Sequence, residues 1–221
     1  MGRRPAGLNP DLALVGDDDL IARIAERLLP APEEGAGFAM PVPDWMPDPP
    51  HARPPVAAAV LLALVRRPEG TALLYTERSS SLRAHSGQVA FPGGKIDPTD
   101  LDAAHAAIRE AGEEVGLVPQ DARILGFMPR YLSGTNYLIT PVVAEVRPSG
   151  PFVANPSEVE AFFEVPLHWV MASENYVTQR LGQGGTVHSS WQLLHETRTI
   201  WGITANLTRR FRDLALAAEA A

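Results

Sequence analysis

The chain has 221 residues, of which 45% are hydrophobic and 20% are charged, an ordinary balance for a globular protein with one sizeable core. The formal net charge of −7 excludes a general attraction to nucleic acid or to an anionic membrane surface. The sequence contains no cysteine, which excludes disulfides, zinc–thiolate sites and a cysteine nucleophile. It has neither a secretory signal nor a run of about 18 apolar residues long enough to span a membrane, so we expect a cytoplasmic protein.

The first 55 residues divide into a helix and an arm. Residues 17–29, DDDLIARIAERLL, predict a helix whose apolar face consists of Leu20, Ile21, Ile24, Ala25 and Leu28. Residues 30–55 hold nine of the 21 prolines and cannot form a regular helix or a central strand, so we expect an extended arm. Because the arm also contains Phe38, Met40, Trp45 and Met46, we expect it to pack on the body of the protein or on a second subunit.

From residue 56 to residue 221 the pattern is that of one mixed domain. VAAAVLLALV and TALLYTE predict two strands joined by RRPEG, and further strands are expected at ARILGFM, NYLITPVVAEV and AFFEVPL. A helix is predicted over residues 100–115 with Thr99 or Asp100 as its N-cap, followed by a short helix near Leu167, a hairpin across GQGGT and a terminal helix from about Ile203. Strands on both sides of a central helix favour an α+β sandwich.

The segment FPGGKIDPTDLDAAHAAIREAGEEVGL, residues 91–117, carries the chemistry. Its helical part places Glu110, Glu113 and Glu114 at positions i, i+3 and i+4, where side chains crowd one patch. Arg109 lies one turn before Glu113 and can neutralise it, which leaves the other two carboxylates for a hard cation such as Mg²⁺. The alternative is a solvated acidic helix face, but the preceding Gly93–Gly94 turn and the buried apolar stripe of the helix favour a metal site.

These residues resemble the Nudix box, G-x5-E-x7-R-E-U-x-E-E-x-G-U, in which U is aliphatic. The motif positions are filled by Arg109, Glu110, Glu113, Glu114, Gly116 and Leu117. The first half departs from the pattern, because the nearest fit uses Gly94 and Asp100 with one extra residue before the arginine. The resemblance implies an α/β/α sandwich with a mixed sheet and a catalytic loop–helix–loop.

The residues before the box resemble the coenzyme A pyrophosphatase branch of this family, roughly L-L-T-x-R-S-x3-R-x3-G-x3-F-P-G-G. The matching residues are Arg78, Ser79, Arg83, Gly87, Phe91, Pro92, Gly93 and Gly94, whereas Tyr75 stands where the pattern has its second leucine. Later, WGITAN at residues 201–206 is similar to the start of the branch's C-terminal helix.

The resemblance implies a reaction and roles for individual residues. Water attacks a phosphorus of a nucleoside diphosphate derivative, helped by Mg²⁺ or Mn²⁺, and coenzyme A would yield 3′,5′-ADP and 4′-phosphopantetheine. We expect metal ligands at Glu110, Glu113 and Glu114, with Gly94 allowing the backbone close to the metal, and substrate contacts from Arg78, Arg83, Lys95 and Gly93. Arg109 is expected to orient the cluster through Glu113, and Glu158 is a candidate general base.

Other functions stay open on the sequence alone. The pocket of such an enzyme could instead prefer ADP-ribose, a dinucleotide or an oxidised nucleotide. A binding module that has lost turnover is a further alternative, although all three glutamates of the cluster are retained. The expected partner is a small molecule rather than nucleic acid or a membrane, and a homodimer built through the arm is a separate hypothesis.

Overall fold

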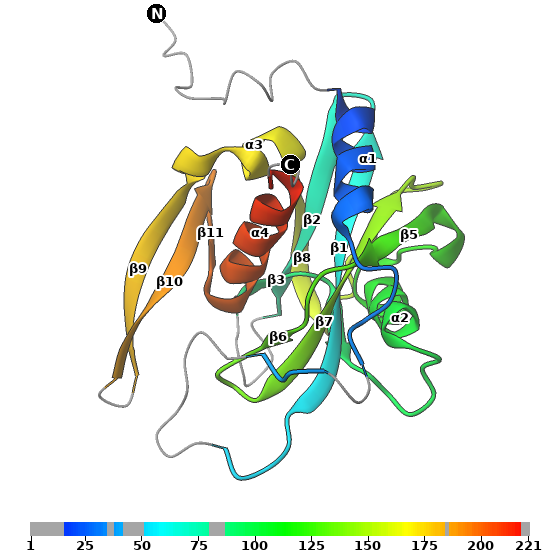
Figure 1. The fold of residues 1–221 in the computed structure, drawn as a ribbon. Helices are drawn as coiled ribbons and strands as arrows, with labels where there is room; N and C mark the ends of the chain where they lie inside the picture. The colour runs from blue at the N-terminus through cyan, green and yellow to red at the C-terminus, as the bar shows by residue number, and fades with distance from the viewer. Residues whose placement is uncertain (1–15, 35–37, 42–50, 80–86, 184–185, 218–221) are drawn as a thin grey trace, which may run out of the picture.

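The computed structural model describes residues 16–34, 38–41, 51–79, 87–183 and 186–217, which form a central sheet with helices on both faces (Figure 1). The helices are α1 (Asp17–Arg27), α2 (Ala103–Val115), α3 (Leu167–Met171) and α4 (Gly202–Ala215), with short 3₁₀ turns at Pro119–Asp121 and Ser173–Asn175. The strands are β1 (Val56–Arg67), β2 (Gly70–Arg78), β3 (Val89–Ala90), β4 (Gly93–Lys95), β5 (Ala122–Phe127), β6 (Tyr131–Leu132), β7 (Tyr137–Val146), β8 (Val159–Pro166), β9 (Tyr176–Gln183), β10 (Thr186–His195) and β11 (Arg198–Trp201). None of the described helices is long and apolar enough to cross a membrane.

The main sheet is mixed. Its strand order is β3-β2-β1-β7-β5, with β4 paired to β1, β6 to β7 and β8 to β2. Strands β1 and β7 run parallel over ten residue pairs, whereas the other pairings of this sheet are antiparallel. Central strands covered on both faces must be apolar throughout, which explains why Leu61–Val65 of β1 is fully buried. The α+β fold expected from the sequence is confirmed.

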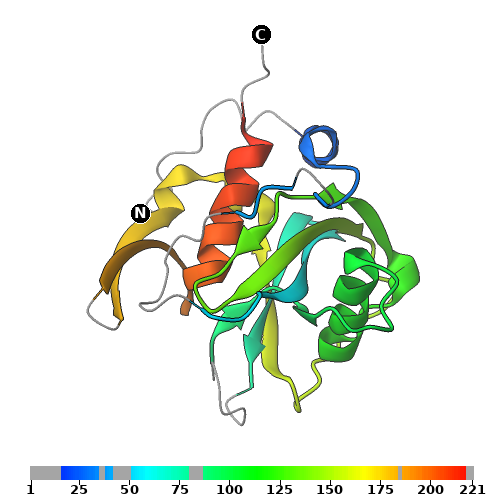
Figure 2. The same ribbon diagram turned by 60° about the horizontal axis from the view of Figure 1, so that its bottom comes forward.

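Alternate residues of β1 face two different helical layers. Leu62 and Leu64 belong to the core that includes α1, α3 and α4, while Leu61, Ala63 and Val65 belong to the core that includes α2. Figure 2 shows the sheet between α2 on one side and α4 on the other. The two layers therefore make an α/β/α sandwich, and a smaller sheet of β9, β10 and β11 lies beside α4. The hairpin expected across residues 182–186 is the antiparallel connection of β9 to β10.

Buried hydrogen bonds fix α4 against the rest of the domain. Thr204 donates from Oγ1 to the carbonyl of Val89 in β3 at 2.9 Å. Asn206 donates to the hydroxyl of Tyr131 at 3.2 Å and accepts from the backbone N–H of Trp191. Because a buried polar group that loses its partner costs about 1–3 kcal/mol, these contacts hold the first turns of α4 in one position.

The described part of the arm packs on the body of the domain. Leu29 forms an antiparallel bridge with Phe127, and Arg130 pairs with Glu34 at 2.5 Å while its guanidinium lies over the ring of Phe38. Trp45 and Met46 lie outside the described residues.

The start of α2 differs from the expectation. The helix begins at Ala103, and its N-cap is Asp102, whose side chain accepts from the backbone N–H of His105 at 2.8 Å. The prediction of Thr99 or Asp100 as the cap was wrong, because Asp100 accepts from the backbone N–H of Asp97 and from Arg109 instead.

Candidate active site

Helix α2 carries the predicted carboxylates on one face of the sheet, over β1 and β4. Small residues on its buried face allow the helix to lie close to β1; they are Ala103, Ala106, Ala107 and Ala111, followed by Val115. The helix ends at Gly116, which adopts a left-handed conformation with φ of 69°. This arrangement directs Glu110 and Glu114 towards β4, where both line a common cavity.

Three carboxylates converge beside β4. Glu110, Glu114 and Glu158 each offer an oxygen within 4.8 Å of the others. Glu113, which we expected to join them, has a side chain that is 48% exposed and contacts Arg109 instead. The structure therefore brings together two of the three expected glutamates of α2 and adds Glu158, which the sequence suggested only as a base.

The two glycines of β4 are required by the packing around these carboxylates. A Cβ atom on Gly94 would overlap the carboxylate of Glu110, and one on Gly93 would overlap the backbone of Ala59. Gly93 has a φ of 156°, and its backbone N–H donates to the carboxylate of Glu114. Both glycines also line the cavity, as expected for backbone that approaches a ligand closely.

Glu158 is held in place by the loop that follows β7. The backbone N–H of Asn155 donates to the carbonyl of Glu114 at 2.9 Å, which ties this loop to the end of α2. The Asn155 side-chain amide donates to Glu158 at 3.4 Å, and the backbone N–H of Ser79 donates to the Glu158 carbonyl at 3.0 Å. Glu158 thus reaches the cluster from an element distant in the sequence.

The electrostatics of the cluster favour a cation. Burial above all, together with the charges of Glu110 and Glu158, raises the pKa of Glu114 to about 8, against the opposing effects of the Gly93 hydrogen bond and the Arg78 charge. Burial also raises the pKa of Glu110. The buried Oε2 of Glu114 has no hydrogen-bond partner among the described residues. Oxygen donors of this kind, crowded together and incompletely paired, fit a hard divalent cation.

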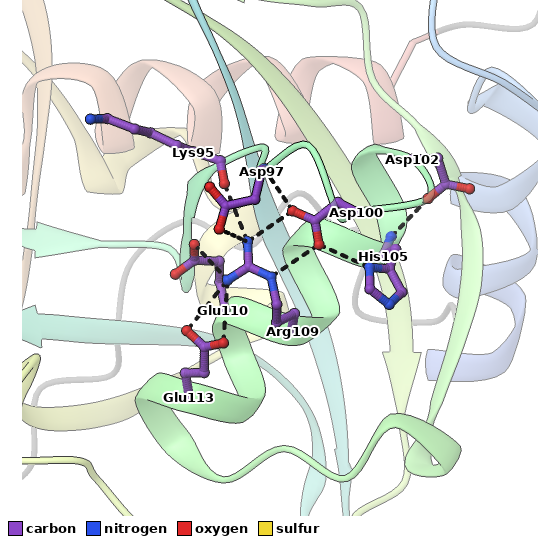
Figure 3. A network of polar contacts seen from close by, with 8 residues as sticks. All are labelled: Lys95, Asp97, Asp100, Asp102, His105, Arg109, Glu110 and Glu113. Atoms are coloured by element: carbon purple, nitrogen blue, oxygen red, sulfur yellow. Dashed lines mark hydrogen bonds and ion pairs between the residues drawn. The ribbon is translucent and has the colours of Figure 1, made fainter.

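Arg109 organises the loop before α2 and the carboxylates after it (Figure 3). Its guanidinium donates to both oxygens of Asp100, at 3.0 and 2.9 Å, a bidentate pairing. It also donates to Glu110 at 3.1 Å, to Glu113 at 3.3 Å and to the carbonyl of Lys95 at 3.3 Å. The expected contact with Glu113 exists, but Asp100, whose side chain is fully buried, is the main partner.

Asp100 links stability to pH. Hydrogen bonds from Arg109 above all, and then from Asp97 and His105, hold its pKa well below the usual range against the effect of burial. A pKa lowered by folding stabilises the protein above the unfolded-state value of about 4 and loses that contribution as the pH falls below it. We expect Asp100→Asn to lower the melting temperature at pH 7, with a gap to wild type that narrows between pH 5 and 3. Melting curves across this range measure the gap.

The control for this prediction is Asp213→Asn, because Asp213 is half-exposed and pairs with Arg209 on the surface of α4. Such a pair contributes less than about 1 kcal/mol, so this variant should melt near wild type at every pH. If the difference in melting temperature between Asp100→Asn and wild type stays constant down to pH 3, the ionised carboxylate of Asp100 does not stabilise the fold.

The carboxylate cluster opens into a cavity of about 450 Å³ that also extends to α4. Arg78, Gly93 and Lys95, three of the expected substrate-binding residues, line it. Arg83, the fourth of them, lies outside the described residues. The sequence analysis did not identify Ile203 and its neighbours in α4 as a wall of the cavity. The motif WGITAN, which contains Ile203, was the signal that could have identified them.

Comparison with known proteins places this fold and site in a class. A model of the NUDIX domain matches residues 55–181, and the chain belongs to the Nudix family of hydrolases, which act on phosphoric anhydrides and generally use divalent metal ions. The uncharacterized Nudix hydrolase NudL of Escherichia coli K12 is 43% identical over 159 residues, covering 72% of this chain and 81% of the relative. NudL of Salmonella newport is similar to the same extent. The Nudix hydrolase RenU of M. smegmatis shares the fold, with a TM-score of 0.51 and 19% identity over 80% of this chain and 96% of its own.

Proposed function

We propose that this protein is a metal-dependent pyrophosphohydrolase that cleaves the diphosphate of coenzyme A, or of its acyl derivatives, to 3′,5′-ADP and 4′-phosphopantetheine. The observation that carries the hydrolase assignment is the convergence of Glu110, Glu114 and Glu158 on a cavity that Arg78 also lines. The choice of coenzyme A rests on the signature resemblance around Arg78–Gly94, part of which lines the same cavity.

Glu110, Glu114 and Glu158 would hold Mg²⁺ or Mn²⁺. Such an ion, when bound, neutralises the diphosphate and makes the attacking water more acidic. Glu113 is not part of the cavity cluster and accepts from Arg109, and we assign it a positioning role through that arginine. Glu158, expected from the sequence as a base, sits close enough to both helix glutamates to serve as a ligand.

The substrate's negative charge needs cations from the chain. Arg78 is exposed at the end of β2, and its charge acts on Glu114, so its planar guanidinium can pair with phosphate oxygens beside the cluster. The ammonium group of Lys95 extends away from the Arg109 network (Figure 3), and Lys95 lines the cavity. Hydrolysis forms a bond from water oxygen to phosphorus and breaks a bridging P–O bond, and a carboxylate of the cluster receives the proton that water releases.

The test is a substrate panel with Mg²⁺ or Mn²⁺, comparing coenzyme A, acetyl-coenzyme A, ADP-ribose and a dinucleoside polyphosphate. We expect metal-dependent release of 3′,5′-ADP from coenzyme A or its acyl form, with the highest kcat/KM of the panel. Preference for ADP-ribose or the dinucleotide would refute the coenzyme A assignment while keeping a Nudix hydrolase. Absence of turnover on every compound would favour a binding module.

Three sequence-based expectations remain proposals: a domain boundary between residues 55 and 56, a location in the cytoplasm, and a homodimer formed through the proline-rich arm. For the homodimer, light scattering on a chain lacking residues 1–50 is the test. An unchanged number of subunits per particle would refute a role of the arm in assembly.

A further inference from the structure

One side of the cavity, formed by α4 and β7, is lined by uncharged and largely apolar residues. Ile203 and Leu207 of α4 form one wall, and Tyr137 and Ile139 of β7 line the same cavity on the sheet. Ile139 and Leu207 are buried, whereas Ile203 and Tyr137 are partly exposed. The α4 wall lies beyond residues 55–181, the part of the chain that the NUDIX domain model matches.

Charge is distributed unevenly along this cavity. Its charged lining residues come from β2, β4, α2 and the loop before β8: Arg78, Lys95, Glu110, Glu114 and Glu158. Among the described residues that α4 and the segment 135–139 contribute to the lining, none is charged. A charged group placed against α4 would lose hydration without gaining a partner, whereas an uncharged group would gain from burial.

Polar but uncharged groups complete this side of the cavity. Gln88 and Thr135 line the cavity and are at least partly exposed; the Thr135 hydroxyl is hydrogen-bonded to Ser133 at 3.0 Å and keeps capacity for one further partner, beside the Gln88 amide. Thr204 also lines it, but its hydroxyl donates to the carbonyl of Val89 and fixes the wall in place. Methylene and methyl groups interrupted by amides match this combination better than a polyhydroxylated sugar does.

We propose that the α4 side of the cavity binds the pantetheine arm of the substrate and is the surface that selects coenzyme A over other nucleoside diphosphates. This inference rests on the proposed function. The arm packs its methyl and methylene groups on Ile203 and Leu207, and its amides reach Gln88 and Thr135. The diphosphate then lies at the carboxylate cluster and Arg78, and the 3′,5′-ADP half makes no contact with Ile203.

Ile203→Asp tests the proposal, because Ile203 is partly exposed and tolerates substitution better than the buried Leu207. Binding is measured by calorimetric titration with Mg²⁺ present. We expect the variant to bind 4′-phosphopantetheine at least about tenfold more weakly than wild type, since a tenfold change corresponds to the loss of one well-packed apolar contact. Its affinity for 3′,5′-ADP should change less than about twofold. The KM for coenzyme A should rise in parallel. Ile203→Met, which keeps the apolar surface, should bind both fragments like wild type.

Leu214→Asp is the matched control, since Leu214 is a partly buried residue of the same helix that packs on the same core but does not line the cavity. It should bind both fragments like wild type. The proposal is overturned if Ile203→Asp weakens 3′,5′-ADP as much as 4′-phosphopantetheine, if Leu214→Asp has the same effect, or if the wild type does not bind 4′-phosphopantetheine. Failure of the proposed function is seen separately, as absence of coenzyme A hydrolysis by the wild type.

Discussion

Glu114→Gln is expected to reduce metal-dependent hydrolysis at least about 100-fold, because the bound ion supplies several kcal/mol of transition-state stabilisation and each 1.36 kcal/mol is tenfold in rate. Glu114 is 6% exposed and belongs to the carboxylate cluster with Glu110 and Glu158. The variant should also lose the rise in melting temperature that Mg²⁺ or Mn²⁺ gives the wild type, since an ion that binds only the folded state stabilises it. Steady-state kinetics and melting curves measure the two effects.

The same substitution at Glu26 provides the control, because Glu26 is exposed on α1 and does not line the cavity. Without metal, Glu114→Gln should melt no lower than wild type at neutral pH, because a pKa raised to about 8 leaves Glu114 mostly uncharged there and the amide has nearly the same shape. A variant that keeps both turnover and the metal-induced rise in melting temperature would show that the ion does not bind at Glu114.

Arg109→Ala is expected to lower the free energy of unfolding by about 3–5 kcal/mol, the usual cost of removing one partner of a buried ion pair. The change leaves the buried carboxylate of Asp100 without its bidentate partner, and it frees Glu110 from the guanidinium. Urea titration measures the effect. Activity should fall as well, because Glu110 would no longer be held beside Gly94.

Two comparisons separate this role from a general loss of charge. Arg123→Ala removes an arginine that is 68% exposed and pairs with Glu145. Glu145 keeps Arg66 and Arg147 as partners, so this change should lower the free energy of unfolding by less than about 1 kcal/mol. Arg109→Ala combined with Asp100→Ala should cost less than the sum of the single changes. Additive costs in the double variant would contradict the pairing.

Most of the fold could be predicted from local patterns. The apolar run of β1 and the apolar face of α1 are visible in the sequence, because the residues that become buried are apolar. Both elements were therefore expected close to their observed bounds. The N-cap of α2 was not predictable, because Asp100 and Asp102 are equally suited to capping. Only the tertiary contact with Arg109 removes Asp100 from that role and leaves it to Asp102.

The sequence predicts only the part of the candidate site that lies within one segment of the chain. Helical geometry places Glu114 about 40° and Glu113 about 60° from Glu110, on opposite sides, so the spacing alone does not separate Glu113 from the cluster. Glu113 accepts from Arg109, while Glu110 and Glu114 face the cavity. Glu158 joins them from a loop distant in the sequence, and the α4 wall comes from the end of the described chain. Such non-local contacts depend on how the layers pack, which periodicity and motif spacing do not encode.

The most direct test of the metal site is a crystal structure of the wild type soaked in Mn²⁺, with the ion located by its anomalous scattering. We predict a peak within coordination distance of carboxylate oxygens from Glu110, Glu114 and Glu158, with Glu113 still bound to Arg109. A peak at Glu113 alone, or no peak between these three carboxylates at a concentration that supports turnover, would contradict the account.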